Sequence, residues 1–204
     1  MPDREQHWED IYTNNSPLRV SWYQELPLLS MQLIRDLQIK ADSPILDVGG
    51  GAATLVDKLC HDGYTNVSVL DISATALRLS KERLAGVADS VTWYLSDVTT
   101  FRPPHPFTVW HDRASFHFLT AAEDRARYRD VLNQALRPGG HAIIMTFALD
   151  GPQKCSGLEI VRYDSEKLTA ELGSGFDLLK TGHETHRTPS DRRQKFAYFH
   201  LRKR

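Results

Sequence analysis

Acidic residues and glycines stand together at one short segment of the chain. The segment ILDVGGG, which follows Pro44, places Asp47 directly before a run of glycines. That run consists of Gly49, Gly50 and Gly51. Glycines let the backbone turn tightly and approach a ligand closely. A second acid, Asp71, comes 20 residues after Gly51, where its carboxylate can accept hydrogen bonds from both hydroxyls of a ribose.

A third acid, Asp97, helps to choose between a dinucleotide and S-adenosylmethionine as the cofactor. Asp97 and Val98 follow a later strand, at a position suited to the edge of an adenine ring, and Ile72 adds a nucleoside contact beside Asp71. A dinucleotide would use the glycines and Asp71 equally well, but Thr54 occupies the third glycine position of its motif. A carboxylate at Asp47 can bind the ammonium group of S-adenosylmethionine, so the pattern favours that cofactor.

Strand and helix patterns alternate along most of the chain. Apolar runs predict strands over residues 44–48, 66–71, 90–95, 107–111 and 141–147. Helices are expected over residues 26–37, 52–62, 73–86, 120–136 and 165–173. Ser73 is a plausible N-cap, and Thr120 and Glu123 have the spacing of a capping box. Such alternation indicates right-handed βαβ units and a parallel sheet.

The C-terminal part of the chain has a different pattern. Two extended runs, residues 176–185 and 195–203, are separated by a turn at 188–191 and should pair as a hairpin. We therefore expect a three-layer α/β/α Rossmann-like sandwich. Its seven-stranded, mostly parallel sheet has five parallel strands and an antiparallel C-terminal hairpin. The whole chain, 1–204, is expected to form one domain, with an N-terminal helical cover over 1–40 and the sheet in 41–204.

These motifs together resemble the class I S-adenosylmethionine-dependent methyltransferases over roughly residues 40–204. The match comprises the glycine segment, Asp71, Asp97 and the RPGG loop at 137–140. The segments VSWYQ, VWHDRASFHFL and FALDGPQKCSGLEIVRYD, with ETHRTP, resemble a bacterial group similar to the citrate synthase lysine methyltransferase. This resemblance implies that Trp22 and Tyr23 cover the cofactor; packing under the N-terminal helix is the alternative.

Polar residues after the fourth predicted strand are the first candidates for the reaction itself. Asp112 could orient or deprotonate an amine, and His111 and His117 could act as bases, because histidine titrates near neutral pH. Arg113 could hold a carboxylate of the acceptor in a bidentate contact, or pair internally with Asp112. His111 could equally be a core residue, because it still alternates with the strand.

The long connection after the fifth strand supplies two further acceptor candidates, Arg162 and Tyr163. Insertions at the carboxyl edge of a sheet commonly form the substrate wall of α/β enzymes. No metal site is expected, because the histidine spacings match no compact ligand motif.

Composition narrows the possible partners. A net charge of −1 over 204 residues offers no basic excess for nucleic acid. Two cysteines and no apolar run of about 18 residues predict a cytoplasmic protein without a membrane segment. We expect methyl transfer to nitrogen or oxygen of a small molecule or a protein side chain, lysine included. An NAD(P)-dependent oxidoreductase and a non-catalytic S-adenosylmethionine-binding protein are the alternatives. The acceptor and the oligomeric state stay open.

Overall fold

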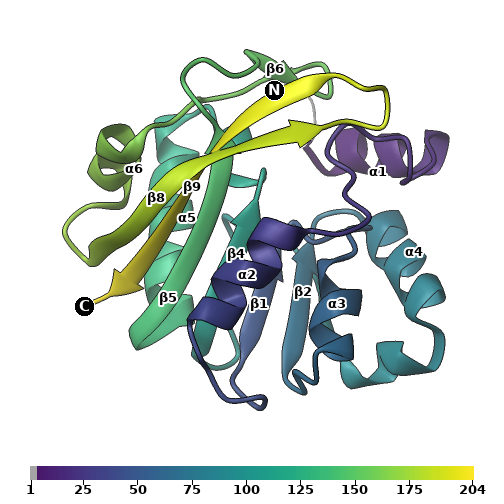
Figure 1. Cartoon of the computed structure of the whole chain (residues 1–204), viewed down its shortest axis with the longest axis horizontal. Coiled ribbons are helices and arrows are strands. Elements are labelled where there is room, and N and C mark those ends of the chain that lie inside the picture. Colours follow the sequence, from purple (N-terminus) through teal and green to yellow (C-terminus); the bar gives the residue numbers. More distant parts are fainter. Residues whose placement is uncertain (1–3) are drawn as a thin grey trace.

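The computed structural model describes residues 4–204, so the first three residues of the expected N-terminal cover lie outside it. One seven-stranded sheet, in the order β3-β2-β1-β4-β5-β9-β8, runs through the molecule (Figure 1). Its strands are β1 (Ile45–Val48), β2 (Val67–Asp71), β3 (Thr92–Leu95), β4 (Phe107–Arg113), β5 (Leu136–Phe147), β8 (Phe176–Arg187) and β9 (Arg193–Lys203). The first five are mutually parallel, and β9 pairs antiparallel with both β5 and β8. The predicted sheet and hairpin are confirmed.

Helices cover both faces of this sheet. They are α1 (Arg4–Asn14), α2 (Leu28–Asp36), α3 (Leu55–His61), α4 (Ala74–Leu84), α5 (Ala122–Ala135) and α6 (Ser165–Leu172), with 3-10 turns η1 (Ala85–Ser90) and η2 (Phe116–Phe118). Apolar side chains of α2, α3 and α4 pack on one face, and those of α5 and α6 pack on the other. Three layers result, as predicted.

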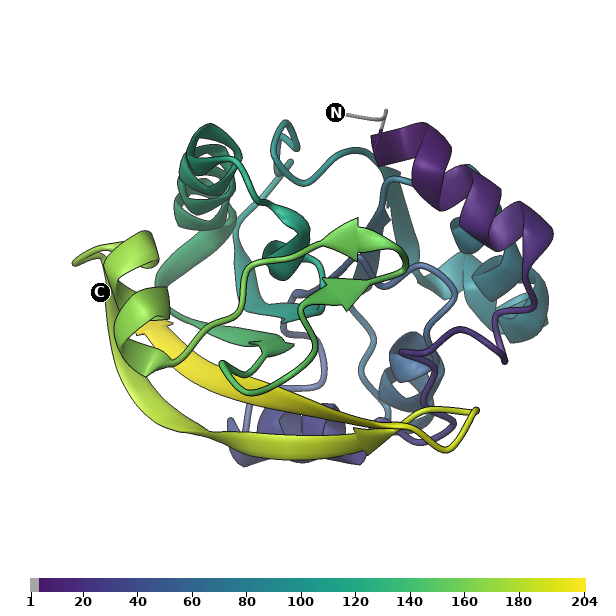
Figure 2. The same ribbon diagram turned by 90° about the horizontal axis from the view of Figure 1, so that it is seen from above.

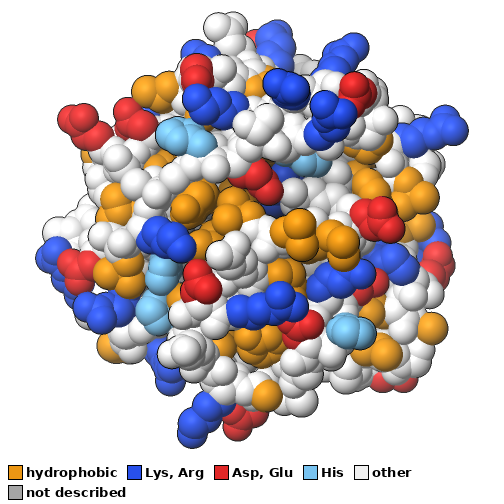
Figure 3. Space-filling model, in the orientation of Figure 1, with side chains coloured by type: hydrophobic (Ala, Val, Ile, Leu, Met, Phe, Trp, Pro, Cys, Tyr) orange, Lys and Arg blue, Asp and Glu red, His pale blue; other side chains and the backbone are white. Residues whose placement is uncertain are grey.

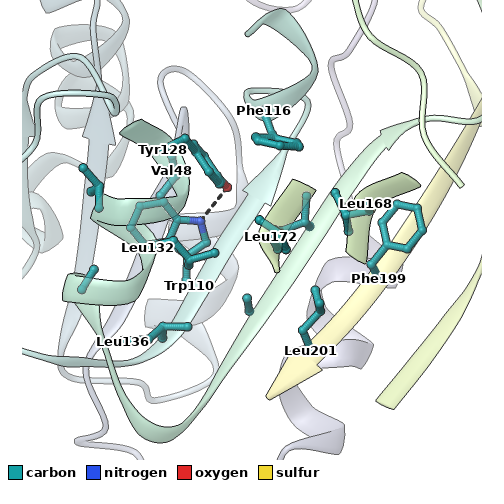
Figure 4. Packing of buried hydrophobic residues seen from close by; sticks show 14 of the residues in the cluster. Val48, Trp110, Phe116, Tyr128, Leu132, Leu136, Leu168, Leu172, Phe199 and Leu201 are labelled. Atoms are coloured by element: carbon teal, nitrogen blue, oxygen red, sulfur yellow. Dashed lines mark hydrogen bonds between the residues drawn. The ribbon is translucent and has the colours of Figure 1, made fainter. Parts of the chain in front are cut away.

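The central strands are buried because helices cover both faces. Successive side chains of a strand point to opposite faces, so Ile45 joins the core under α2 and α3 while Leu46 joins the core under α5. Figure 4 shows the second core, where the indole of Trp110 donates a 2.9 Å hydrogen bond to the hydroxyl of Tyr128. These two cores hold the carboxyl ends of the strands in place, and ligands bind at those ends in α/β folds.

Helix starts agree with the sequence in one case and differ in another. The Ser73 side chain accepts a hydrogen bond from the Ala76 amide, as expected of an N-cap. The capping box at Thr120 and Glu123 is wrong. The cap position of α5 is Ala121, which makes no side-chain cap bond, and the Thr120 carbonyl accepts from Arg125 instead. The predicted cap, Thr120, lies one residue before the cap position that the structure shows.

Two elements were not predicted individually. Helix α1 lies beside the carboxyl ends of the strands, and a small hairpin, β6 (Lys154–Cys155) with β7 (Leu158–Glu159), crosses above them (Figure 2). Both lie over the edge of the sheet where ligands bind in α/β folds.

The surface in Figure 3 mixes positive and negative side chains on one face, in keeping with the near-neutral net charge. None of the helices within residues 4–204 combines the length and the apolar character that crossing a bilayer requires. The same residues contain no cluster of three or more His, Cys, Asp or Glu side chains arranged to hold a metal ion.

Candidate cofactor and acceptor site

The glycine turn after β1 is packed so tightly that side chains do not fit. Gly49 has φ of +64° and Gly51 has φ of +38°, backbone conformations that favour glycine. The amides of Gly49 and Gly50 both donate to the Leu70 carbonyl, at 2.7 and 3.3 Å. A Cβ at Gly49 would lie 1.8 Å from the Ser115 hydroxyl oxygen. The turn is therefore pinned to β2 on one side and to the segment after β4 on the other.

Asp71 ends β2 and faces this turn. Its Oδ1 accepts a 2.8 Å hydrogen bond from the Ser73 amide, and the side chain is almost entirely buried. A Cβ at Gly51 would lie 2.7 Å from its Oδ2 and 3.2 Å from the Tyr12 hydroxyl. Burial raises the pKa of Asp71 to about 7, against the effect of hydrogen bonds from the Ser73 and Ile72 amides.

Asp97, after β3, is held by its own turn and by helix α1. Its Oδ1 accepts from the amide and the hydroxyl of Thr99, each at 2.7 Å. Its Oδ2 lies 2.9 Å from the Arg4 guanidinium, which also contacts Asp124 at 3.2 Å. The predicted adenine-side acid thus stands at the expected strand end, with α1 attached to it.

A first cavity joins these strand ends to a roof of aromatic side chains. It measures about 770 Å³ including its open mouth, within the usual range for small-molecule sites. Its lining consists of Arg4, Trp8, Tyr12, Trp22, Val48, Gly49, Leu70, Asp71, Ile72, Ser96, Asp97, Val98, Arg113, Ala114, Ser115, Phe118, Leu119 and Cys155. Three strand ends separated in sequence therefore meet at one place, as the motif spacing predicted.

A second cavity, about 580 Å³ with its opening, adjoins the first. Its lining consists of Tyr12, Pro17, Val20, Trp22, Tyr23, Gln24, Pro27, Ser30, Asp47, Val48, Gly49, Gly50, Ala52, Ala53, Thr54, Leu55, His111 and Arg113. The residues common to both cavities are Tyr12, Trp22, Val48, Gly49 and Arg113. The two cavities are therefore neighbouring parts of one site. Trp22 lines both parts and Tyr23 lines the second.

Asp47 and His111 form a buried pair in the second cavity. His111 Nδ1 lies 2.7 Å from Asp47 Oδ1, and His111 Nε2 lies 2.9 Å from the Ser30 hydroxyl. A carboxylate only accepts, so Nδ1 carries the proton in this contact. His111 thus holds Asp47 in place, and it does not line the first cavity.

Two other predicted bases do not reach either cavity. Asp112 is fully buried and accepts from the Ser115 amide at 2.8 Å and from the Tyr128 hydroxyl at 2.7 Å. Burial raises the pKa of Asp112 to about 6. His117 is also fully buried; burial and the charge of Arg113 lower its pKa to about 3, so the ring is neutral at pH 7. Alternation along β4 turns Asp112 toward α5 while its neighbours line the site.

The two candidates from the long connection also lie outside the cavities. Arg162 donates to the Gly151 carbonyl at 3.2 Å and closes that loop on itself. Tyr163 is fully buried, with its ring 5.1 Å from that of Phe116. Neither residue is brought to the lining of the site.

Helix α1 supplies site residues that the sequence analysis did not assign. Trp8 packs edge-on against Phe118 and Trp22, at centroid distances of 4.8 and 5.7 Å. The Trp22 indole donates a 3.3 Å hydrogen bond to the Tyr12 hydroxyl. The only sequence signal was a pair of aromatic residues four positions apart, which marks one face of a helix.

The Glu9 side chain connects α1 to the start of α4. The Glu9 carboxylate accepts from the Ser73 hydroxyl at 2.6 Å and from the Thr75 amide at 3.2 Å, at the start of α4. Burial opposes ionisation, but the hydrogen bonds from Ser73 and Thr75 prevail and lower the pKa of Glu9. A carboxylate at a helix N-terminus is also favoured by the helix dipole.

Comparisons with known proteins agree with this geometry. Residues 45–140 match the family model of a methyltransferase domain. Human EEF1A lysine methyltransferase 2 is 25% identical over 195 residues, which cover 86% of this chain and 75% of that protein.

Solved structures share the fold at lower identity. A protein described in connection with the conversion of a disulfide bond into a thioacetal group during echinomycin biosynthesis has a TM-score of 0.79 and 16% identity. The match covers 98% of this chain and 92% of that one. N-methyltransferase NodS from Bradyrhizobium japonicum, in complex with S-adenosyl-L-homocysteine, has a TM-score of 0.73 and 17% identity, over 98% and 99% of the two chains.

Proposed function

Because the chain belongs to the class I S-adenosylmethionine-dependent methyltransferases and uses that cofactor, we propose that it methylates nitrogen or oxygen of a small, largely apolar acceptor. The observation that carries the proposal is the first cavity. One wall holds the ends of β1, β2 and β3, and the roof holds Trp8, Trp22 and Phe118. Donor contacts and a largely apolar space for an acceptor thus adjoin.

The residues present fit the methyl donor. Added side chains at Gly49 or Gly51 would collide with neighbours, which is the signature of a backbone cradle. We assign Asp71 and Ile72 to the ribose and Asp97 and Val98 to the adenine, because all four residues line the first cavity. Asp47 is assigned to the ammonium group, with His111 fixing its Oδ1 and leaving Oδ2 beside Gly50.

The residues of the chain have two tasks in this chemistry: they align the acceptor with the methyl group, and they exclude water. When bound, the cofactor supplies an activated methyl group on a sulfonium, so no strong base is required. We assign Trp8, Trp22 and Phe118 to exclude water and orient the acceptor. Asp112 acts as a positioning residue: it accepts from two amides of the turn that carries Ser115 and Phe116, beside the acceptor space.

The lining favours a small molecule over a lysine side chain. A cationic lysine needs an open groove with acidic groups, whereas the acids that line the first cavity, Asp71 and Asp97, lie at the nucleoside end. Protein lysine is the second candidate, favoured by the 25% identity to human EEF1A lysine methyltransferase 2.

The test pairs binding with a transfer assay. Calorimetry should show S-adenosylmethionine binding and no tight NADH binding; the reverse result would establish the oxidoreductase alternative. Methyl-labelled cofactor is then incubated with cell extract separated into protein and metabolite fractions. Label in the metabolite fraction supports the proposal, and label confined to protein supports the lysine candidate. Binding without transfer to any fraction would indicate a non-catalytic protein.

A further inference from the structure

The tip of the β8–β9 hairpin stands beside the roof of the site. Near the end of β8, His186 Nε2 donates a 2.8 Å hydrogen bond to the Ser21 carbonyl, one residue before Trp22. Two positions earlier, Glu184 Oε2 lies 3.5 Å from Nη2 of Arg113, which lines both cavities. Figure 2 shows the tip beside the segment that follows α1. A molecule bound at the tip would therefore border the site.

Positively charged side chains gather at this tip, residues 187–195, which we call the basic tip. Its cations are Arg187, Arg192, Arg193 and Lys195, and its one acid is Asp191. Four positive charges and one negative charge give the basic tip a net charge of +3, which leaves −4 for the rest of a chain whose net charge is −1. Figure 3 shows Lys and Arg side chains at the top of the view, over the end of this hairpin. The basic tip thus differs in sign from the remainder of the protein.

Half of these cations are neutralised by acids of the chain. Arg187 Nη1 lies 2.9 Å from Asp191 Oδ1, and Lys195 Nζ lies 2.6 Å from Asp150 Oδ2. The other two cations are exposed, and neither side chain forms an ion pair within residues 4–204. Their charge is therefore available to a partner.

Protection of the sheet edge does not account for this arrangement. Cations on an edge strand discourage pairing with another chain, and β8 is an edge strand of this sheet. Three of the four cations, however, lie in the turn or on β9, which is paired with β8. Arg193 on β9 stands directly opposite Arg187, and like charges in that position destabilise a hairpin. These cations cost the fold some stability, which points to a role in binding.

The turn that carries the cations is held by its own hydrogen bonds. The Thr188 amide donates to the Arg192 carbonyl at 2.9 Å, and Thr188 Oγ1 accepts from the Arg192 amide at 3.1 Å. Thr188 is 4% exposed, and Asp191 has φ of +64°, a conformation that aspartate adopts more readily than most residues. The backbone under the cations is therefore fixed before a partner binds.

Spacing and surroundings indicate the kind of partner. Arg193 and Lys195 are two positions apart on one strand, so they share a face at a separation of about 6.6 Å. Alternate side chains of an extended acidic segment repeat at the same distance. A nucleic acid or an anionic membrane carries its charge over a longer distance, and it would reach beyond the basic tip to a surface of net negative charge. A short acidic segment of a protein meets the cations alone.

We propose that the basic tip docks an acidic segment of a partner protein, with Arg192 and Arg193 as its principal contacts. The proposal goes beyond the proposed function and does not depend on it, because it uses neither the donor nor the acceptor. Since the basic tip adjoins the roof, a docked partner lies next to the site where transfer would occur.

Fluorescence anisotropy with a defined peptide tests the proposal. The probe is a short fluorescein-labelled peptide of alternating glutamate and serine, whose acids have the spacing of the cations. The wild-type protein should bind it, and Arg192→Gln/Arg193→Gln should bind it about three- to tenfold more weakly, as expected for the loss of two exposed ion pairs. Raising the ionic strength should weaken wild-type binding and reduce this difference.

A matched variant removes the same charge from elsewhere on the surface. Arg102 and Arg137 are exposed and lie outside the hairpin, so Arg102→Gln/Arg137→Gln should bind the peptide as the wild type does. None of these four arginines lines either cavity, so both variants should also bind S-adenosylhomocysteine like the wild type. Circular dichroism checks that each variant is folded.

The possible outcomes separate this proposal from the proposed function. The proposal is overturned if the wild-type protein does not bind the peptide, if Arg192→Gln/Arg193→Gln binds it equally well, or if the matched variant loses as much affinity. Tighter binding of a single-stranded oligonucleotide or of phosphatidylserine vesicles than of the peptide also overturns it. Failure of the wild-type protein to bind S-adenosylhomocysteine would remove the proposed function and leave the docking result in place.

Discussion

The floor and the roof of the site are built in different ways. The floor consists of the residues that follow β1, β2 and β3, and each stands within a few positions of a strand of the main sheet. The roof consists of α1 with Trp8, Trp22, Phe118 and the β6–β7 hairpin, all of which lie outside the strands of the main sheet. Its contacts join residues far apart in sequence: Glu9 meets Thr75, 66 positions on, and Trp22 meets Arg113, 91 positions on.

This difference predicts different consequences of substitution. The floor is part of the hydrogen-bonded sheet, because the Gly49 and Gly50 amides donate to the Leu70 carbonyl. Changes there should alter the affinity for the donor. The roof is held by a few polar contacts and a small aromatic cluster at the edge of the fold, and segments of that kind open at low free-energy cost. Changes there should alter how fast the donor enters and leaves.

The largest effect is expected at Gly49. A Cβ there would lie 1.8 Å from Ser115 Oγ, and φ of +64° is strained for any other residue. Gly49→Val should weaken S-adenosylmethionine binding by about 100-fold or more. Calorimetry measures this. Gly63 has φ of +89° with open space around it, so Gly63→Val tests backbone strain alone and should bind normally. A Gly49→Val protein with wild-type affinity would contradict the assignment of the floor.

Asp71→Asn should have the next largest effect. The variant keeps the shape of a side chain that accepts from the Ser73 amide, but it loses the charge that strengthens bonds to ribose hydroxyls. Affinity for S-adenosylmethionine should fall by about 10- to 100-fold. Asp164→Asn is the matched control, since Asp164 also accepts an amide hydrogen bond at a helix start and lies away from both cavities. Equal affinities of Asp71→Asn and wild type would remove the ribose role.

Because burial raises the pKa of Asp71 to about 7, the affinity of the site for its ligand should depend on pH. Below that value the free protein carries a neutral carboxyl, and above it a carboxylate that accepts from the ribose. Affinity for S-adenosylhomocysteine should therefore rise about tenfold from pH 6 to pH 8. The quantity to compare is the ratio of wild-type to Asp71→Asn affinity, because the titration of every group that the two proteins and the ligand share cancels in this ratio. A ratio that stays constant from pH 6 to pH 8 would contradict the expectation.

The same contrast explains what the sequence could predict. Strand and helix alternation was sufficient for the sheet, and motif spacing was sufficient for the floor, because both depend on neighbours in the chain. Polar residues at strand ends were ambiguous. Asp112 and His117 are residue types that often act in catalysis. Asp112 instead accepts a hydrogen bond from the Ser115 amide in the turn that follows it, and His117 is buried in the core. In the roof, the resemblance alone placed Trp22 over the cofactor. The positions of Trp8 and Tyr12 could not be predicted, because their docking depends on long-range contacts.

The smallest effect is expected at Glu9, and it tests the roof directly. Glu9→Gln removes the charge that docks α1 onto the first turn of α4 at Ser73 and Thr75. Interactions of this kind contribute about 0.3–1 kcal/mol, so S-adenosylhomocysteine should dissociate about two- to fivefold faster. Stopped-flow displacement, followed by the fluorescence of Trp8 and Trp22, measures the rate. Asp10→Asn is the control, because Asp10 is an exposed residue of the same helix that bonds Gln6. If Glu9→Gln released the ligand no faster than Asp10→Asn, α1 would not be a cover that limits exit from the floor.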